Sequence, residues 1–167
     1  MTRFIEIGLE KRDVRWTARL LDDEAPRTCA AVWDALPLDG DLFHAKYARN
    51  ELYTFVPPFA GSEPGLENPT VTPVPGDVCY FAFAAGQLPT GSYGYEPGEA
   101  TGGHDGAIDL AVFYGRNNLL VNGDVGWVPG NVFATIDDLA SLAAAGNDVW
   151  RHGFAGDRLT FRRVEAP

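Results

Sequence analysis

Residues 4–20 read FIEIGLEKRDVRWTARL, and this stretch decides the fold class. Ile5, Ile7 and Leu9 alternate with a glutamate and a glycine, and the same alternation of apolar and polar residues returns at 15–20. A period of two is typical of a β-strand that buries one face. A polar Lys-Arg-Asp segment lies between the two runs, so the stretch predicts a β-hairpin.

Strand-like patterns recur along the rest of the chain. Short runs rich in β-branched and aromatic residues, bounded by glycine or proline, favour strands. The predicted strands cover residues 42–47, 51–56, 78–83, 108–114, 131–136 and 158–164. Residues 149–151 are expected to extend the last strand or to pair with it.

Two helices are predicted. Between Pro26 and Leu36, apolar residues follow the i, i+3, i+4, i+7 spacing of an amphipathic helix. The second helix is expected over 136–145, with Thr135 as its N-cap and Gly146 as its C-cap.

The order of these elements predicts a mainly β protein with one domain over residues 1–167. Eight strands and two helices favour a closed eight-stranded β-barrel, because closure removes exposed strand edges. Two segments, a proline-rich one at 57–75 and a glycine-rich one at 86–106, are expected to be long loops. Long loops in compact domains are often functional.

Charge and composition exclude several classes of protein. The net charge is −10 and no basic run exists, so a nucleic-acid partner is not expected. No apolar stretch approaches the length of a membrane span, and residues 1–10 lack the pattern of a secretory signal. We therefore expect a cytoplasmic protein with no membrane partner. Cys29 and Cys79 fall within a predicted helix and a predicted strand, which favours buried free thiols.

The order of elements and several short motifs resemble the cyclophilin fold. The chain more closely resembles uncharacterised bacterial proteins with a minimal cyclophilin-like barrel, and this resemblance covers nearly the whole chain. The motifs are Ala25-Pro26-Arg27-Thr28, Leu36-Pro37, Phe43-His44-Ala45, Pro75-Gly76-Asp77-Val78-Cys79-Tyr80, Ala111-Val112-Phe113-Tyr114 and Asn131-Val132-Phe133-Ala134-Thr135-Ile136.

The resemblance does not extend to the chemistry of prolyl isomerases. Those enzymes place an arginine directly after the Phe-His pair, where this chain has Ala45. Lys46 comes next and points to the opposite face of the strand, and Arg49 lies further on. We therefore expect no appreciable prolyl isomerisation.

A ligand pocket is predicted on the open face of the barrel. His44, Glu51, Tyr80, Tyr114 and Arg116 are expected to face one cavity, with Glu51 tuning His44 and with Arg116 or Arg49 as the charged anchor. The full set of predicted ligand-binding residues is His44, Arg49, Glu51, Tyr53, Tyr80, Phe113, Tyr114, Arg116 and Trp127. Tyr93, Tyr95 and His104 of the glycine-rich segment are expected to form a flap over the pocket.

Other kinds of site find little support. The three histidines are far apart and have no metal-binding spacing, so neither a metal nor a cofactor is expected. No serine lies in a nucleophile elbow. Three functions remain open, with catalysis undecided: binding of a small polar or anionic molecule, peptide binding without isomerase activity, and a divergent prolyl isomerase. A homo-oligomer is also open.

Overall fold

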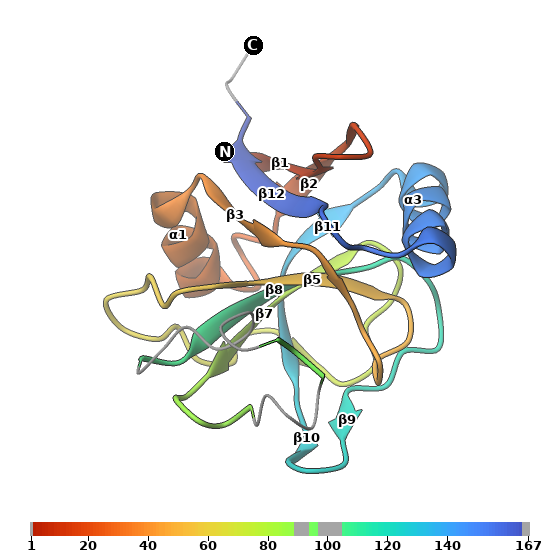
Figure 1. Cartoon of the computed structure of the whole chain (residues 1–167). Helices are drawn as coiled ribbons and strands as arrows, with labels where there is room; N and C mark the ends of the chain where they lie inside the picture. The colour runs from red at the N-terminus through yellow and green to blue at the C-terminus, as the bar shows by residue number, and fades with distance from the viewer. Residues whose placement is uncertain (1, 89–93, 97–104, 165–167) are drawn as a thin grey trace.

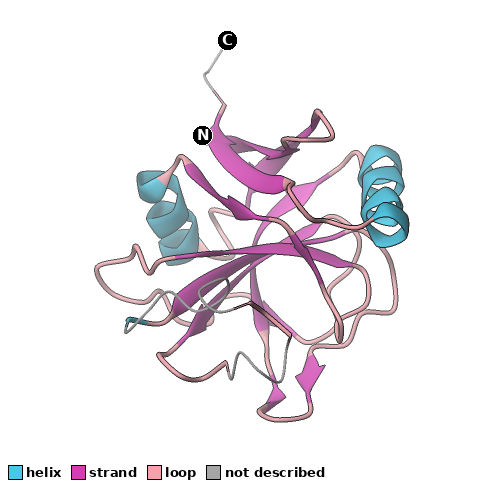
Figure 2. Ribbon diagram, in the orientation of Figure 1, coloured by secondary structure: helices cyan, strands magenta, loops and turns pink. Residues whose placement is uncertain are grey.

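The computed structural model describes residues 2–88, 94–96 and 105–164 of the chain. These residues form one large antiparallel sheet, a small two-stranded sheet and two helices. Figure 1 shows that α1 (Pro26–Ala35) and α3 (Leu139–His152) lie on opposite sides of the molecule, with the strands between them. Figure 2 shows the same predominance of strand over helix. The mainly β prediction with two helices is confirmed.

Most strands of the large sheet overlap predicted ones, but the short strands at residues 38–41 and 69–70 were not predicted. Ten strands make it up: β1 (Phe4–Leu9), β2 (Val14–Leu20), β3 (Leu38–Asp41), β4 (Phe43–His44), β5 (Glu51–Val56), β6 (Pro69–Thr70), β7 (Asp77–Phe83), β8 (Ala107–Phe113), β11 (Gly130–Ile136) and β12 (Arg158–Arg163). β9 (Val121–Asn122) and β10 (Gly126–Trp127) form the small sheet. The predicted hairpin is confirmed, since β1 pairs with β2 in an antiparallel register.

The strand pairings among the described residues give the large sheet an open path. The strand order is β3-β12-β1-β2-β11-β7-β8-β5-β4, and no strand pairing among the described residues joins its two ends. The two end strands nevertheless follow each other in the chain, separated by Leu42. Gly40 of β3 also lies against β5, where a Cβ atom would stand 2.2 Å from Thr54 Oγ1. The closed eight-stranded barrel is therefore not confirmed.

Both faces of the central strands are buried. One face packs into the main core, which contains Leu52, Leu110 and Phe133. The other face packs into a second cluster, which contains Phe43, Tyr53, Phe81 and Phe113 among others. All seven residues of β8 are buried as a result. A strand buried on both faces is a near-continuous apolar run.

The first helix receives its N-terminal cap from a distant segment. Pro26 occupies the first turn, where a missing N–H costs nothing. Glu67 accepts hydrogen bonds from the backbone N–H groups of Arg27 (3.1 Å) and Thr28 (2.7 Å). This carboxylate ties the predicted proline-rich loop to α1 and stabilises the otherwise unpaired helix N–H groups.

The second helix lies further along the chain than predicted. Asp138, not Thr135, is the N-cap, and its side chain accepts a hydrogen bond from Ser141 N at 3.2 Å. Gly146 lies inside the helix, which ends at Gly153 with a φ of 87°. The prediction that 149–151 form a strand is wrong, because Val149 continues the buried stripe of Leu142 and Ala145.

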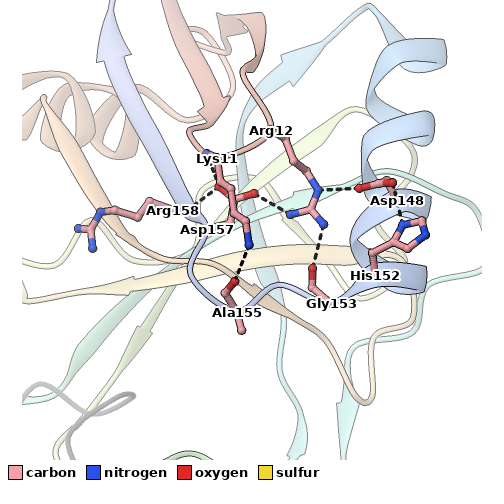
Figure 3. Close-up of polar contacts among 8 residues, drawn as sticks. All are labelled: Lys11, Arg12, Asp148, His152, Gly153, Ala155, Asp157 and Arg158. Carbon is pink, nitrogen blue, oxygen red and sulfur yellow. Dashed lines mark hydrogen bonds and ion pairs between the residues drawn. The ribbon is translucent and has the colours of Figure 1, made fainter.

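Asp157 joins the β1–β2 turn to the start of β12, two segments that lie far apart in the sequence (Figure 3). Its buried carboxylate accepts hydrogen bonds from Lys11 N and Arg158 N, both at 2.8 Å, and from Arg12 Nη1 at 2.7 Å. Arg12 also donates to Asp148 of α3, at 2.8 Å. The β1–β2 turn is thereby fixed to the α3–β12 connection.

We expect Asp157→Asn to lower the free energy of unfolding by about 1.5 kcal/mol, because the amide loses the charge-assisted bond to Arg12 while it keeps one acceptor oxygen. Urea unfolding measures this change. Asp39→Asn is the control, because Asp39 also pairs with an arginine, Arg158, but is half exposed. Exposed ion pairs contribute about 0–1 kcal/mol. Equal losses in the two variants would contradict the prediction.

Both cysteines are free and buried, as predicted. Burial raises the pKa of the Cys29 thiol to about 12 and that of Cys79 well above its usual value. Both therefore stay as inert thiols at neutral pH. Neither helix in the described part of the chain is long and apolar enough to cross a membrane.

Candidate functional site

The second cluster brings side chains from three neighbouring strands to one face of the sheet. Glu51, Tyr53 and Phe55 alternate along β5 and share a face. On β8, Asp109 pairs with Phe55 on one side and with Phe81 of β7 on the other. Residues paired across neighbouring strands point to the same side of a sheet. Two carboxyl groups therefore lie among aromatic rings on a buried face.

A cavity of about 100 Å³ lies against this face, and we call it the acid cavity. Its deepest polar side chains are Glu51 and Asp109, each only 7% exposed. The sheet supplies its aromatic wall, and segments 45–48, 119–122 and 125–128 supply most of the rest. The aromatic members of its lining are Tyr47, Tyr53, Phe55, Phe81, Phe83 and Tyr95.

Burial favours the protonated form of both carboxyl groups of the acid cavity. It raises the pKa of Glu51 to about 8. It raises the pKa of Asp109 well above its usual value, and the charge of Glu51 adds to the effect. Loss of water disfavours a charged carboxylate, and a second negative charge nearby disfavours it further. Such acids can donate a hydrogen bond or a proton, which ordinary surface carboxylates cannot.

A second, larger cavity of about 550 Å³ lies beside the first, and we call it the aromatic cleft. One side of the aromatic cleft is formed by β4 and the segment that follows it. The other side is formed by the C-terminal end of α3. Its aromatic lining residues are Phe43, His44, Tyr47, Tyr53, Tyr95, Trp150 and Phe154. Trp150 is 68% exposed and forms one open edge. Tyr53, Tyr95 and Lys46 line both cavities, so the two are neighbours with shared walls.

Ring contacts order the shared wall. Phe43 stacks on Tyr53 with centroids 5.5 Å apart and meets Tyr95 edge-on at 5.2 Å. The hydroxyl groups of Tyr53 and Tyr95 form a hydrogen bond. Edge-to-face and offset stacked rings stabilise each other. Tyr95 therefore lines both cavities, while the other two residues of the predicted flap, Tyr93 and His104, lie outside the described residues.

His44 is held in place at the inner end of the aromatic cleft. Its Nε2 lies 2.7 Å from Tyr114 Oη, and its Nδ1 lies 3.1 Å from Ala45 O. Its ring lies 5.2 Å from that of Trp150. Burial lowers the pKa of His44, so the neutral ring dominates at pH 7. A neutral ring with both nitrogens engaged orients Tyr114 and Trp150.

His44 and Glu51 do not interact as predicted. In the β4–β5 register, His44 pairs with Leu52, which belongs to the main core, while Glu51 points to the second cluster. Adjacent residues on a strand face opposite sides of the sheet. The prediction that Glu51 tunes His44 is wrong for this reason.

The predicted five-residue pocket does not form around one cavity. Tyr80 donates to Glu63 at 2.7 Å, and it lines a third cavity of about 290 Å³ together with Trp127. Arg116 is exposed and lines none of these three cavities, and Arg49 is exposed as well. Both arginines follow the ends of strands in polar turns, which leaves their side chains in solvent.

Some of the predicted residues do lie together in pairs. The structure brings His44 together with Tyr114, and Glu51 together with Tyr53. Phe113 is fully buried in the second cluster and supports the acid cavity from behind.

The prediction missed several residues of the site, among them Lys46, Asp109, Trp150 and Phe154. Asp109 had a signal, because it is the only charged residue in the otherwise apolar strand AIDLAVF. Trp150 was hidden by the wrong strand prediction for residues 149–151. Within the described residues, no group of three or more potential ligands could hold a metal ion.

A family model matches this chain over residues 7–161, and its description is "Protein of unknown function (DUF3830)". The chain belongs to this family. A search of curated proteins found no match. The cyclophilin-like resemblance is not confirmed by these comparisons.

The DUF3830 chain is similar in fold to a solved structure titled "Structure of McbB in complex with tryptophan". The TM-score is 0.61 and the sequences are 19% identical. The similarity covers 98% of this chain and 45% of the other, so the chain spans less than half the length of that neighbour. At this identity the likeness shows a shared fold.

Proposed function

We propose that this DUF3830 chain binds a small organic molecule across the aromatic cleft and the acid cavity. The observation that carries the proposal is the wall shared by the two cavities, where Tyr53 and Tyr95 face both a ring-lined cleft and two buried acids. Ligand sites are concave, mostly apolar and equipped with a few polar groups. The paired cavities have each of these properties.

Size and exposure support the same proposal. The cleft volume of about 550 Å³ lies within the range of roughly 300–1,000 Å³ that is usual for ligand sites. Trp150 at 68% exposure and Phe154 at 38% present large apolar surface to solvent beside it. A bound ring would cover this surface. The fold neighbour in complex with tryptophan adds an example of a related fold that holds a small aromatic molecule.

Peptide binding is the second candidate, because the same exposed Trp150 and Phe154 leave one side of the cleft open. We still expect no appreciable prolyl isomerisation, because Ala45 occupies the position at which prolyl isomerases have an arginine. We keep the cyclophilin-like closed barrel, a cytoplasmic location, a bacterial origin and a homo-oligomer as proposals. The closed barrel is supported by β3 and β4, which stand at the two ends of the sheet but follow each other directly in the chain.

Titration with a neutral aromatic probe, 2-phenylethanol, tests the proposed function. We expect chemical-shift changes in the indole signal of Trp150 and in the amides of Tyr53 and Tyr95, and none at Trp33, which packs between Arg3 and Arg163. Trp150→Ala is expected to weaken binding of the probe at least fivefold.

Trp127→Ala is the matched control, because Trp127 is 63% exposed and lines the third cavity. It is expected to leave probe binding unchanged. Shift changes centred on Trp127 and Tyr80, or none at millimolar probe, would contradict the proposal.

A further inference from the structure

The charges buried in the site decide which kind of ligand it accepts. Glu51 and Asp109 are the acidic side chains of the acid cavity, and both are more than nine-tenths buried. The cation in its lining is Lys46, which is exposed and stands at the rim shared with the aromatic cleft. The buried part of the lining therefore offers carboxyl groups and no cation, which suits a positively charged group of a ligand.

Asp109 has an acceptor that the folded chain does not satisfy. Its Oδ1 is buried and has no hydrogen-bond partner within the described residues. β8 is paired with β5 and β7 on both sides, and the residues opposite Asp109 are Phe55 and Phe81. Neither ring can donate a hydrogen bond. A buried polar group without a partner is costly and is a common mark of a functional site.

The aromatic rings supply a second kind of recognition. The ring of Phe55 contacts those of Tyr53 and Tyr95 at centroid distances of 5.5 and 5.6 Å, and all three rings line the acid cavity. The faces of such rings attract cations, more strongly where water is excluded. Carboxyl oxygens combined with aromatic faces are the arrangement that binds an ammonium group.

We propose that the ligand of this site carries an alkylammonium head, which Glu51 and Asp109 hold in the acid cavity while an apolar or aromatic body lies in the aromatic cleft. This inference rests on the proposed function. An ammonium has three N–H donors, and one of them would pair Asp109 Oδ1. The chemical class is a small organic amine, and it replaces the anionic ligand expected from Arg49 and Arg116.

Binding of an ammonium group is also expected to change the protonation of Glu51 and Asp109. Burial raises the pKa of both acids and so favours their protonated form, whereas a cation beside them favours the charged carboxylate. Ammonium binding therefore releases a proton from the pair to solvent, and affinity rises with pH. The other titratable groups that face the acids are Lys46, Tyr47, Tyr53 and Tyr95 in the wall and Cys79 behind it. Tyr53 and Cys79 have raised pKa values and stay neutral over pH 6–8.

Three probes with the same ring and chain length separate the possible heads: 2-phenylethylammonium, neutral 2-phenylethanol and anionic 3-phenylpropionate. Calorimetric titration of the full chain at pH 6, 7 and 8 is the measurement. An alkylammonium keeps its proton in this range, since such amines have a pKa near 10. We expect the cation to bind at least tenfold more tightly than the alcohol at pH 8. We also expect its affinity to rise at least threefold from pH 6 to pH 8.

Repeating the calorimetric titration in buffers with different ionisation enthalpies measures the number of protons released. We expect a net release of protons when the cation binds. Asp109→Asn and Glu51→Gln are each expected to remove most of the preference for the cation over 2-phenylethanol. Glu63→Gln is the matched control, because Glu63 lines the third cavity, and it is expected to keep the preference.

The outcomes separate this inference from the proposed function. Equal binding of the cation and the alcohol, tighter binding of the anion, or cation binding without proton release would overturn the inference and leave the site as a small-molecule site. Failure of all three probes to bind would overturn both. Proton release is measured on the unaltered chain, so the inference stays testable if a variant does not fold.

Discussion

The free energy of unfolding is expected to fall as the pH rises from 6.5 to 8, by about 2 kcal/mol through Glu51 alone, and Asp109 acts in the same direction. The slope per released proton is about 1.4 kcal/mol per pH unit. Most proteins are acid-sensitive, because their carboxylates are stabilised in the charged form. This chain is expected to lose stability in the opposite direction, towards alkaline pH.

The sign follows from the two states of Glu51. Its pKa is about 8 when the chain is folded, and its usual value is 4.5. Between these values the folded state holds a proton that the unfolded state has lost, so higher pH favours unfolding. Asp109 has a raised pKa for the same reason and acts in the same direction.

Other groups titrate outside this window or oppose the effect below it. His44 has a lowered pKa, so the unfolded state takes up a proton below about pH 6.5 and stability there rises with pH. Glu67 and Asp22 have lowered pKa values and contribute stability that is lost only in acid. The range from 6.5 to 8 therefore isolates the buried acids.

Urea unfolding at half-unit steps of pH measures the slope. Glu51→Gln is expected to reduce this slope by the equivalent of about one proton and to raise the free energy of unfolding at pH 8. Glu24→Gln is the matched control, because Glu24 is exposed beside α1, and it is expected to leave the slope unchanged. Stability that is flat or that rises from pH 6.5 to 8 in the unaltered chain would contradict the prediction.

The strands were predictable because their signal is local. Alternation along residues 4–20 is enough to place β1 and β2, and β5 begins and ends at the predicted residues. The two-residue β4 and the separate β3 were less visible, because each is defined by a partner far away in the sequence. The path of the sheet depends on such pairings, so its openness could not be obtained from the sequence.

The site was predictable only in part because it is assembled by register. Glu51 and Tyr53 were named from their strand, and the structure places both on the acid cavity. Their partner Asp109 meets them only through the β5–β8 pairing, which no local pattern specifies. The arginines were chosen for their charge, but their turns leave them in solvent. The pKa of a carboxyl group depends on burial, which becomes visible only in the folded chain.

The C-terminal end of α3 shows why a correct rule can give a wrong boundary. Glycine is common just beyond helix ends, so Gly146 was predicted as the C-cap. In the structure it lies within the helix, and a Cβ atom there would stand 2.2 Å from Tyr114 Cγ. The glycine is required by the close approach of an aromatic ring, which the sequence of the helix does not reveal.

We expect Gly146→Ala to lower the free energy of unfolding by about 2 kcal/mol or more. Glycine inside a helix normally costs about 1 kcal/mol relative to alanine, so an ordinary site would gain stability from this change. Here the added methyl group meets the ring of Tyr114, and overpacking of this kind costs about 1–3 kcal/mol, occasionally more.

Tyr114 cannot move aside without breaking other contacts. Its ring is buried, its backbone N donates to Asn50 O at 2.9 Å, and its Oη lies 2.7 Å from His44 Nε2. Any shift of the ring also displaces His44, which contacts Trp150 in the aromatic cleft. Gly146→Ala is therefore expected to weaken binding of 2-phenylethanol as well as folding.

A double-mutant cycle with Tyr114→Leu measures the contact itself. In the leucine background, whose flexible side chain can give way, Gly146→Ala is expected to cost at least 1 kcal/mol less than in the unaltered chain. Ala144→Gly, at an exposed position of the same helix, is the control and is expected to cost about 1 kcal/mol through helix propensity alone. If Gly146→Ala stabilises the chain, as glycine replacement does in ordinary helices, then the packing of α3 against Tyr114 is not as described.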